Sequence, residues 1–132
     1  MGQTTQNKQQ DIAILLLRIG VGCIFIYAGW GKLTGIEGTQ GFFDSIGIPI
    51  PALMAWVVAI VEFFGGILVL LGAWTRIPHL LLAIIMLVAL LTTKLGGGFG
   101  PARLDFILLL ANIALFLLGT GRYAVDEAMG RR

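Results

Sequence analysis

Long apolar stretches separated by short polar ones follow one another along this chain. Four stretches are almost wholly apolar, and they cover residues 12–33, 52–72, 77–95 and 104–119. Each approaches or exceeds the ~20 residues that an α-helix needs to cross the hydrocarbon core of a bilayer. A helix of a soluble bundle would carry a polar stripe facing water, and these segments lack one. The pattern therefore predicts an all-α fold, a four-transmembrane-helix bundle.

Composition supports a membrane protein with a single domain. Hydrophobic residues make up 58% of the 132 residues and charged residues 12%, unlike the average soluble protein. We expect a polar N-terminal tail over 1–11, one membrane domain over 12–121 and a polar C-terminal tail over 122–132. The lipid bilayer is thus the first expected partner.

The connection between the first two predicted spans, residues 34–51, is the longest of the three. Phe42, Phe43 and Ile46 fall on one face of a short helix within it. An amphipathic helix of this kind lies in the plane of a membrane surface. We therefore expect an interfacial segment between helices 1 and 2.

Four spans place both termini on the same side, and the basic residues of the connections indicate which side. Positive charges favour the cytoplasm. The side of the termini carries Lys8, Arg76, Arg122, Arg131 and Arg132, and the other side carries Lys32, Lys94 and Arg103. The bias predicts a multi-pass protein of the plasma (inner) membrane with cytoplasmic termini. The basic residues form no run, so no nucleic-acid partner is predicted.

Two charged residues, Arg18 and Glu62, lie inside the first two apolar segments. A charge at membrane depth costs several kcal/mol, so it is kept where it is paired or functional. At the helical rise, Arg18 lies ~21 Å and Glu62 ~15 Å from the outer ends of their helices, which allows an Arg18–Glu62 ion pair. Such a pair can fix the helix register, or it can line a pocket that binds a polar headgroup or passes a proton.

Small and polar residues share faces with these charges. They suggest a pocket for a ligand such as a quinone, with six candidate residues: Arg18, Gly22, Gly29, Glu62, Gly66 and Asn112. Asn112 is equally suited to a hydrogen bond between helices. A second, outer polar cluster is predicted from Lys32, Lys94, Arg103 and Asp105. The alternative for its basic members is a solvated rim of long side chains.

The residues that are scarce limit the chemistry. One cysteine and one histidine cannot supply an internal disulfide, two haem ligands or a zinc cluster. No nucleophile stands beside a base, so we predict no catalytic residue, no metal site and no intrinsic cofactor. Electron transfer by this chain would need a quinone or the cofactor of a partner subunit.

Three short motifs follow one another in the chain. They read Arg18-x3-Gly22-x2-Phe25-x3-Gly29-x2-Lys32-Leu33, Phe43…Gly47-x-Pro49, and Glu62-x2-Gly65-Gly66-x5-Gly72-x2-Thr75-Arg76. Together they resemble the DoxX family of small four-helix membrane proteins, from about Leu15 to Asp126. Members of that family are associated with a thiosulfate:quinone oxidoreductase and with a mycobacterial membrane oxidoreductase complex, and distant relatives act as receptors or chaperones.

The resemblance leaves two functions open. In the first, the chain is a quinone-interacting or membrane-anchoring subunit of a respiratory or redox complex. Arg18 and Glu62 would then position or protonate a quinone head, and Lys32 and Lys94 would receive an anionic substrate or partner. In the second, it is a noncatalytic accessory or assembly subunit of a larger membrane complex. Whether it is an enzyme stays open, as does homo-oligomer formation.

Overall fold

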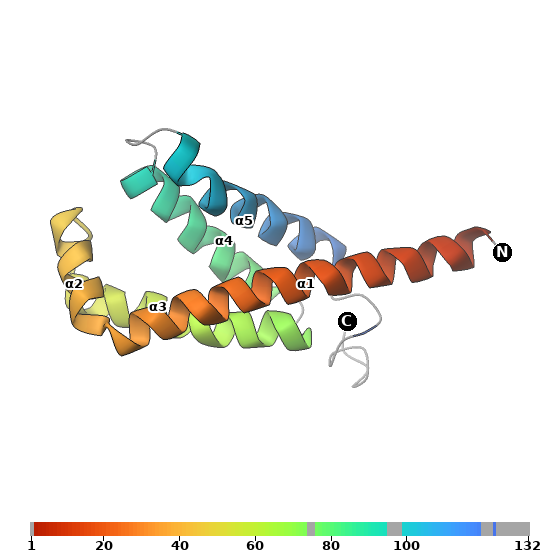
Figure 1. Cartoon of the computed structure of the whole chain (residues 1–132), viewed down its shortest axis with the longest axis horizontal. Coiled ribbons are helices and arrows are strands. Elements are labelled where there is room, and N and C mark those ends of the chain that lie inside the picture. The colour runs from red at the N-terminus through yellow and green to blue at the C-terminus, as the bar shows by residue number, and fades with distance from the viewer. Residues whose placement is uncertain (1, 74–75, 95–98, 120–122, 124–132) are drawn as a thin grey trace.

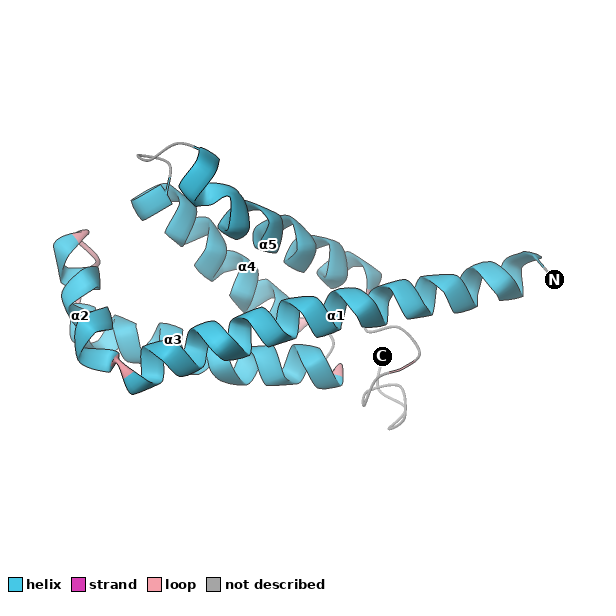
Figure 2. Ribbon diagram, in the orientation of Figure 1, coloured by secondary structure: helices cyan, strands magenta, loops and turns pink. Residues whose placement is uncertain are grey.

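The computed structural model describes residues 2–73, 76–94, 99–119 and 123, and it places the backbone but not the side chains of 2–7, 93–94 and 99–102. The described residues form helices and short connections and contain no strand (Figure 2). The elements are α1 (Gly2–Thr34), α2 (Ile36–Ser45), α3 (Pro51–Leu71), α4 (Ile77–Ala89), the π-helix η1 (Leu90–Lys94) and α5 (Phe99–Leu118). The prediction of an all-α fold is confirmed.

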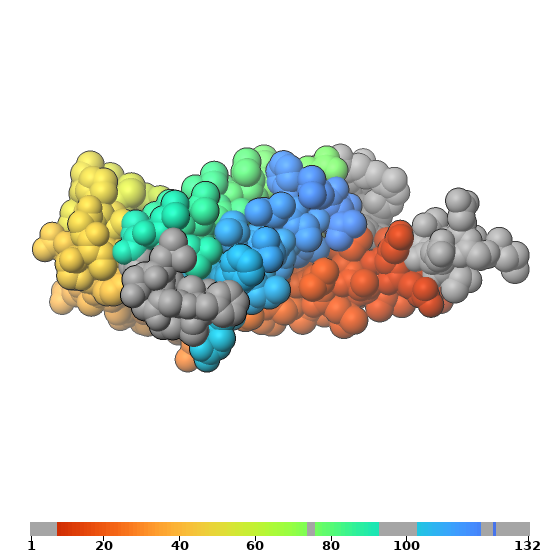
Figure 3. Space-filling model, turned by 90° about the horizontal axis from the view of Figure 1, so that it is seen from above, coloured from red at the N-terminus to blue at the C-terminus, as the bar shows by residue number. Residues whose placement is uncertain are grey.

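The long helices form two antiparallel pairs. α1 packs along α3, and α4 packs along α5 (Figure 1). The two pairs diverge towards the end where α2 crosses the bundle, and α5 also contacts α1 (Figures 1 and 3). The end of the bundle opposite to α2 contains the end of α3, the start of α4 and the end of α5 (Figure 1). α1 continues beyond them by several turns.

Within the described residues, two helices meet the length and apolarity expected of a membrane span. Lys8–Thr34 within α1 and Pro51–Leu71 are long and apolar enough to cross a bilayer, and the apolar helix Ile77–Thr92 is shorter. α1 starts earlier than the predicted span because the polar segment predicted as a tail is helical from Gly2. The predicted C-terminal tail, 122–132, lies outside the described residues except for Tyr123.

Glycine residues bring α1 and α3 into close contact. A Cβ atom on Gly22 would lie 2.9 Å from the Gly66 carbonyl oxygen, and one on Gly66 would lie 2.8 Å from the Ile26 nitrogen. A Cβ atom on Gly29 would collide with the backbone of Phe63. Small residues at such crossings let two helix backbones approach each other within a membrane. The small-residue faces predicted for these two helices are therefore packing surfaces.

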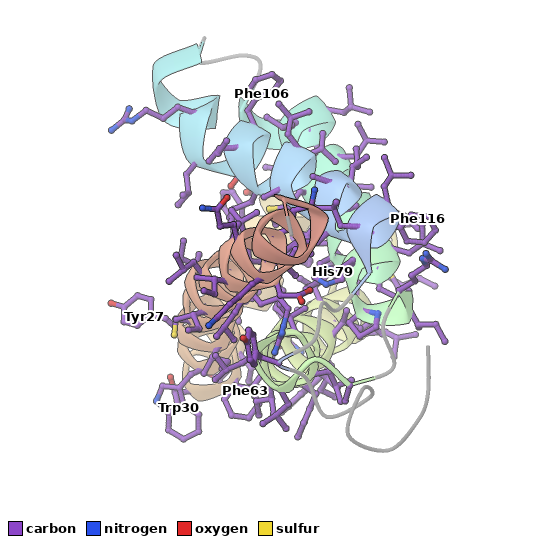
Figure 4. The ribbon with its side chains drawn as sticks, turned by 90° about the vertical axis from the view of Figure 1, so that its right-hand side faces the viewer. Tyr27, Trp30, Phe63, His79, Phe106 and Phe116 are labelled. Atoms are coloured by element: carbon purple, nitrogen blue, oxygen red, sulfur yellow. The ribbon has the colours of Figure 1, made fainter. Side chains whose placement is uncertain are left out.

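Among the described residues, most buried side chains are apolar, and many large apolar side chains are also exposed on the outside. Phe25, Val69, Leu82 and Leu115 are among the buried core residues. Large apolar side chains of every long helix face outwards. In Figure 4, Tyr27 and Trp30 point away from the bundle, while His79 lies between the helices. An exposed surface of this kind is suited to lipid or to another membrane protein.

The C-terminus of α3 has a defined cap. Gly72, with φ of 72°, adopts the left-handed conformation, its N–H donates to the Val69 carbonyl, and the Ala73 N–H donates to the Leu68 carbonyl. This pattern is the Schellman motif, which commonly ends helices at glycine. The Leu70 carbonyl oxygen takes no part in this cap, and Arg18 donates to it and also, as a second donor, to the Val69 carbonyl oxygen.

Candidate functional site

A cavity of about 440 Å³ lies at the α2 end of the molecule, where the two helix pairs diverge. All five α-helices and η1 contribute to its walls, which are mainly apolar. Phe25 and Leu108 lie on one part of the wall, and Phe42 and Phe43 of α2 lie on another. The volume is within the range of pockets that hold small organic molecules. The short helix predicted between helices 1 and 2 is thus present, and its aromatic residues face this cavity.

Polar groups of four helical elements converge in the cavity. Lys32 of α1, Glu62 of α3, Asp105 of α5 and Thr92 of η1 all line it. Lys32 Nζ lies 2.6 Å from Glu62 Oε1, and the side chains are 30% and 3% exposed. The approach is that of an ion pair and not of a well-aligned hydrogen bond, because Glu62 Oε1 has no hydrogen-bond partner in the part of the chain that the structure describes. Asp105 is close enough to act on the charge of Glu62.

The π-helix η1 begins where α4 reaches the cavity. Thr92 within it donates its hydroxyl hydrogen to the Val88 carbonyl over 2.7 Å, and both residues line the cavity. Single turns of π-helix are rare and occur frequently at functional sites. This departure from α-helical geometry supports a site at the cavity, and nothing in the sequence pattern indicated it.

The predicted ion pair between Arg18 and Glu62 is wrong, because the structure pairs Glu62 with Lys32 instead. Arg18 is 1% exposed and lies at the end of α3. Its Nε donates to the Val69 carbonyl over 3.1 Å, and its Nη2 donates to the Leu70 carbonyl over 3.0 Å. Val69 is seven residues after Glu62, or ~10 Å along the helix axis, so the two charges sit at different levels of the bundle.

The error lies in the register between α1 and α3. The depth estimate set the outer ends of the two helices level. In the structure Lys32, near the end of α1, is level with Glu62, which is eleven residues after the start of α3 at Pro51. The start of α3 thus extends beyond α1 towards α2, where the Gln40 side chain donates to the Ala52 carbonyl over 3.1 Å.

The other residues predicted for the pocket occupy different places. Gly22, Gly29 and Gly66 lie at the α1–α3 crossing, and none of them lines the cavity. Asn112 is fully buried between α4 and α5, also away from the cavity. These four residues serve packing in this structure, and a ligand-binding role for them stays a prediction.

The predicted outer cluster is brought together in part. Lys32 and Asp105 line the same cavity, whereas Arg103 is exposed and does not line it. The side chain of Lys94 lies outside the described residues. The structure therefore joins two members of the outer cluster to Glu62, a member of the other predicted group.

A polar contact that the sequence did not indicate lies near the other end of the bundle. His79 is 1% exposed, and its Nδ1 lies 3.1 Å from Asn112 Oδ1. Asn112 Nδ2 already donates to the Leu108 carbonyl over 2.8 Å, so Oδ1 accepts and His79 Nδ1 carries the hydrogen. The sequence offered one signal for this contact, because both residues are polar and lie in predicted apolar segments.

We expect His79 and Asn112 to be energetically coupled. His79→Ala and Asn112→Ala should each lower the stability of the bundle, and the double variant should lose less than the sum by ~1 kcal/mol, in the range measured for hydrogen bonds between membrane helices. Thermal unfolding of the three variants in one detergent measures this difference. Strict additivity of the two losses would contradict the contact.

No metal site accompanies these groups, since the described residues contain no group of three His, Cys, Asp or Glu side chains placed to hold an ion.

The family model described as DoxX matches residues 13–95. The chain belongs to the DoxX family. The DoxX match includes α2, α3 and α4, and it contains both Lys32 and Glu62 of the cavity. The resemblance predicted from the three motifs is confirmed.

Curated relatives match the chain along most of their length. The chain is 45% identical to "Putative oxidoreductase CatD" of Bacillus subtilis (strain 168), over 91% of this chain and 89% of the relative. It is 33% identical to "Inner membrane protein YqjF" of Escherichia coli (strain K12), over 96% and 98%. It is also 33% identical to "Uncharacterized membrane protein Rv3486" of Mycobacterium tuberculosis (strain ATCC 25618 / H37Rv), over 91% and 83%. No solved structure matches the chain. This chain is a membrane protein of the DoxX family.

Proposed function

We propose that this chain is a quinone-binding subunit of a membrane redox complex and that the cavity beside Lys32 and Glu62 is its quinone site. The proposal rests on one observation. A cavity of about 440 Å³ has mainly apolar walls and contains a buried ion pair. A quinone has a flat ring with polar oxygens and an apolar tail. It takes up two electrons and two protons when it is reduced to the quinol. Such a molecule needs apolar surroundings and a few convergent polar groups.

We further propose four membrane spans, with the termini in the cytoplasm and α2 at the opposite, outer surface. The surfaces of α4 and α5 support this, because their outward side chains are as apolar as those of the two longer helices. Lys8 and Arg76 belong to the end of the molecule where α4 starts and α5 ends, and the positive-inside rule favours that end for the cytoplasm. The cavity would then be near the outer leaflet, within reach of lipid-soluble molecules.

The residues of the cavity fit a quinone better than the residues first considered for it. Lys32 offers N–H donors to a carbonyl oxygen, and Phe42 and Phe43 offer ring faces and edges to an aromatic or quinonoid ring. Glu62 holds Lys32 in place. The Bacillus subtilis relative is named "Putative oxidoreductase CatD", which is in line with this proposal. The chain itself would bind and orient the quinone, and electrons would be exchanged with the cofactor of a partner subunit.

Purification in lipid nanodiscs, followed by extraction and mass spectrometry, tests the proposal. We expect quinone to be retained by the native chain above the level of empty nanodiscs. Glu62→Gln should lower retention about tenfold, because it removes the charge that holds Lys32 at the cavity wall. Glu37→Gln is the matched control, since Glu37 is an exposed carboxylate of α2 that does not line the cavity.

The same experiment separates this function from the accessory role. If the native chain retains no quinone and binds none that is added, the quinone proposal fails. An assembly subunit would then be favoured, and co-purification of a larger complex that is lost in Glu62→Gln would support it.

A further inference from the structure

Hydrogen-bond acceptors outnumber donors among the side chains that line the cavity. Glu62 and Asp105 are carboxylates, which only accept when ionised. Thr92 has already given its hydroxyl hydrogen to the Val88 carbonyl, so its oxygen too can only accept. Lys32 is the one side-chain donor on the cavity wall among the described residues. A bound molecule therefore meets more lone pairs than N–H groups.

The donor capacity of Lys32 is further reduced by Glu62. An ammonium group has three N–H donors, and the 2.6 Å approach to Glu62 Oε1 directs Lys32 towards that carboxylate. Glu62 Oε1 is buried and lacks a well-aligned hydrogen bond within the described residues. Lys32 approaches only one of the two oxygens, and a carboxylate has about four lone-pair sites, so Glu62 can also accept from a ligand hydroxyl. Glu62 therefore indicates that the cavity receives a ligand group that donates a hydrogen bond.

The charged side chains of the cavity wall also favour a ligand that donates hydrogen bonds. Among the described residues the cavity wall carries one cation and two carboxylates, so an anionic head would enter against a net negative charge. Arg103 is exposed and does not line the cavity. Neutral heads that donate hydrogen bonds suit this wall, and carboxylate or phosphate heads do not.

From this balance we infer that the cavity binds the reduced quinol in preference to the oxidised quinone. The inference rests on the proposed function and adds the redox form. The two forms share a ring and a tail, but a quinol presents two O–H donors where a quinone presents two carbonyl acceptors. Glu62 and Asp105 accept from the hydroxyls, and Lys32 keeps Glu62 in position. A site of this kind binds both forms and holds the quinol more tightly than the quinone.

Binding of matched ligands to the native chain in nanodiscs tests the preference. The ligands are a short-chain benzoquinone, its quinol kept reduced under anaerobic conditions, and the dimethyl ether of that quinol, which has the same skeleton without O–H groups. We expect the quinol to bind about tenfold more tightly than the other two, which is the effect of one or two additional hydrogen bonds to charged acceptors. Empty nanodiscs correct for partition of each ligand into lipid.

Two variants identify the acceptors. Asp105→Asn replaces a carboxylate by a group that also donates, so the preference for quinol should fall to about threefold or less while quinone binding persists. Asp44→Asn changes an exposed carboxylate of α2 that does not line the cavity, and it should keep the native preference. Asp105 is partly exposed, so its variant is not expected to prevent folding.

The outcomes separate the inference from the function on which it rests. Equal binding of quinone and quinol, or tight binding of the dimethyl ether, would overturn the inference and leave the quinone site standing. Absence of binding by all three ligands would overturn both. An unchanged preference in Asp105→Asn would remove Asp105 from the set of acceptors and contradict the inference as stated.

Discussion

Arg18→Met should lower the midpoint of thermal unfolding in detergent by roughly 10 °C, for a loss of about 3 kcal/mol. The Arg18 guanidinium donates to the Val69 and Leu70 carbonyls at the end of α3 and, over 2.9 Å, to the Tyr123 carbonyl. Methionine fills a similar volume but removes all of these N–H donors, and of the three oxygens that of Val69 keeps the Gly72 N–H. Arg18 is 1% exposed, so water has little access to take the place of its guanidinium.

Two further variants make this prediction specific. Arg18→Lys keeps the charge but not the planar set of donors, and it should recover only part of the loss. Arg76→Met is the matched control, because Arg76 is exposed and donates to one carbonyl, that of Phe116, over 2.9 Å. Its loss should stay below about 1 kcal/mol. If Arg18→Met were no worse than Arg76→Met, Arg18 would not hold the end of α3.

Arg18 also shows why a charge in an apolar segment is tolerated. The sequence presents it as a charge six residues inside a predicted span, which suggested a partner of opposite charge. The structure gives it the carbonyl end of α3, where the helix dipole is negative. Sequence reasoning could identify Arg18 as costly and in need of partners. It could not identify backbone carbonyls as those partners, because any helix end offers them and only tertiary contact selects one.

The long helices were predictable because their signal is local. The apolar segments predicted at 52–72 and 77–95 differ by only a residue from Pro51–Leu71 and from α4 with η1. Apolar length and bounding Pro, Gly and charged residues fix such limits. The π-helical geometry of the last turn was not predictable, since Leu90–Lys94 carries no pattern that separates it from an α-helix.

The candidate site was predictable in its residues but not in their grouping. Lys32, Glu62 and Asp105 were all selected as polar residues in apolar surroundings. They were divided between a central pocket and an outer cluster, because depth was counted from helix ends that the chain does not set level. The register between α1 and α3 depends on the glycine contacts and on the path through α2, which a single sequence does not reveal.

The glycine contacts that set this register allow a direct test. Gly29→Ala should destabilise the bundle by about 2–3 kcal/mol, since the added Cβ would lie 2.6 Å from the Phe63 Cα, and a helix backbone cannot yield as a flexible side chain can. Gly31→Ala, two residues further along α1, has nothing within 4 Å of the new Cβ. It should instead stabilise α1 by about 0.5–1 kcal/mol, the ordinary gain from replacing a helical glycine.

The difference between these two alanine variants also bears on the cavity. Moving α1 away from α3 at Gly29 separates Lys32 from Glu62, because Lys32 is less than one turn further along α1. Gly29→Ala should therefore weaken quinone binding as well as lower the unfolding midpoint, and Gly31→Ala should leave binding intact. A Gly29→Ala variant as stable as Gly31→Ala would mean that α1 and α3 do not touch there. The position of Lys32 beside Glu62 would then need another cause.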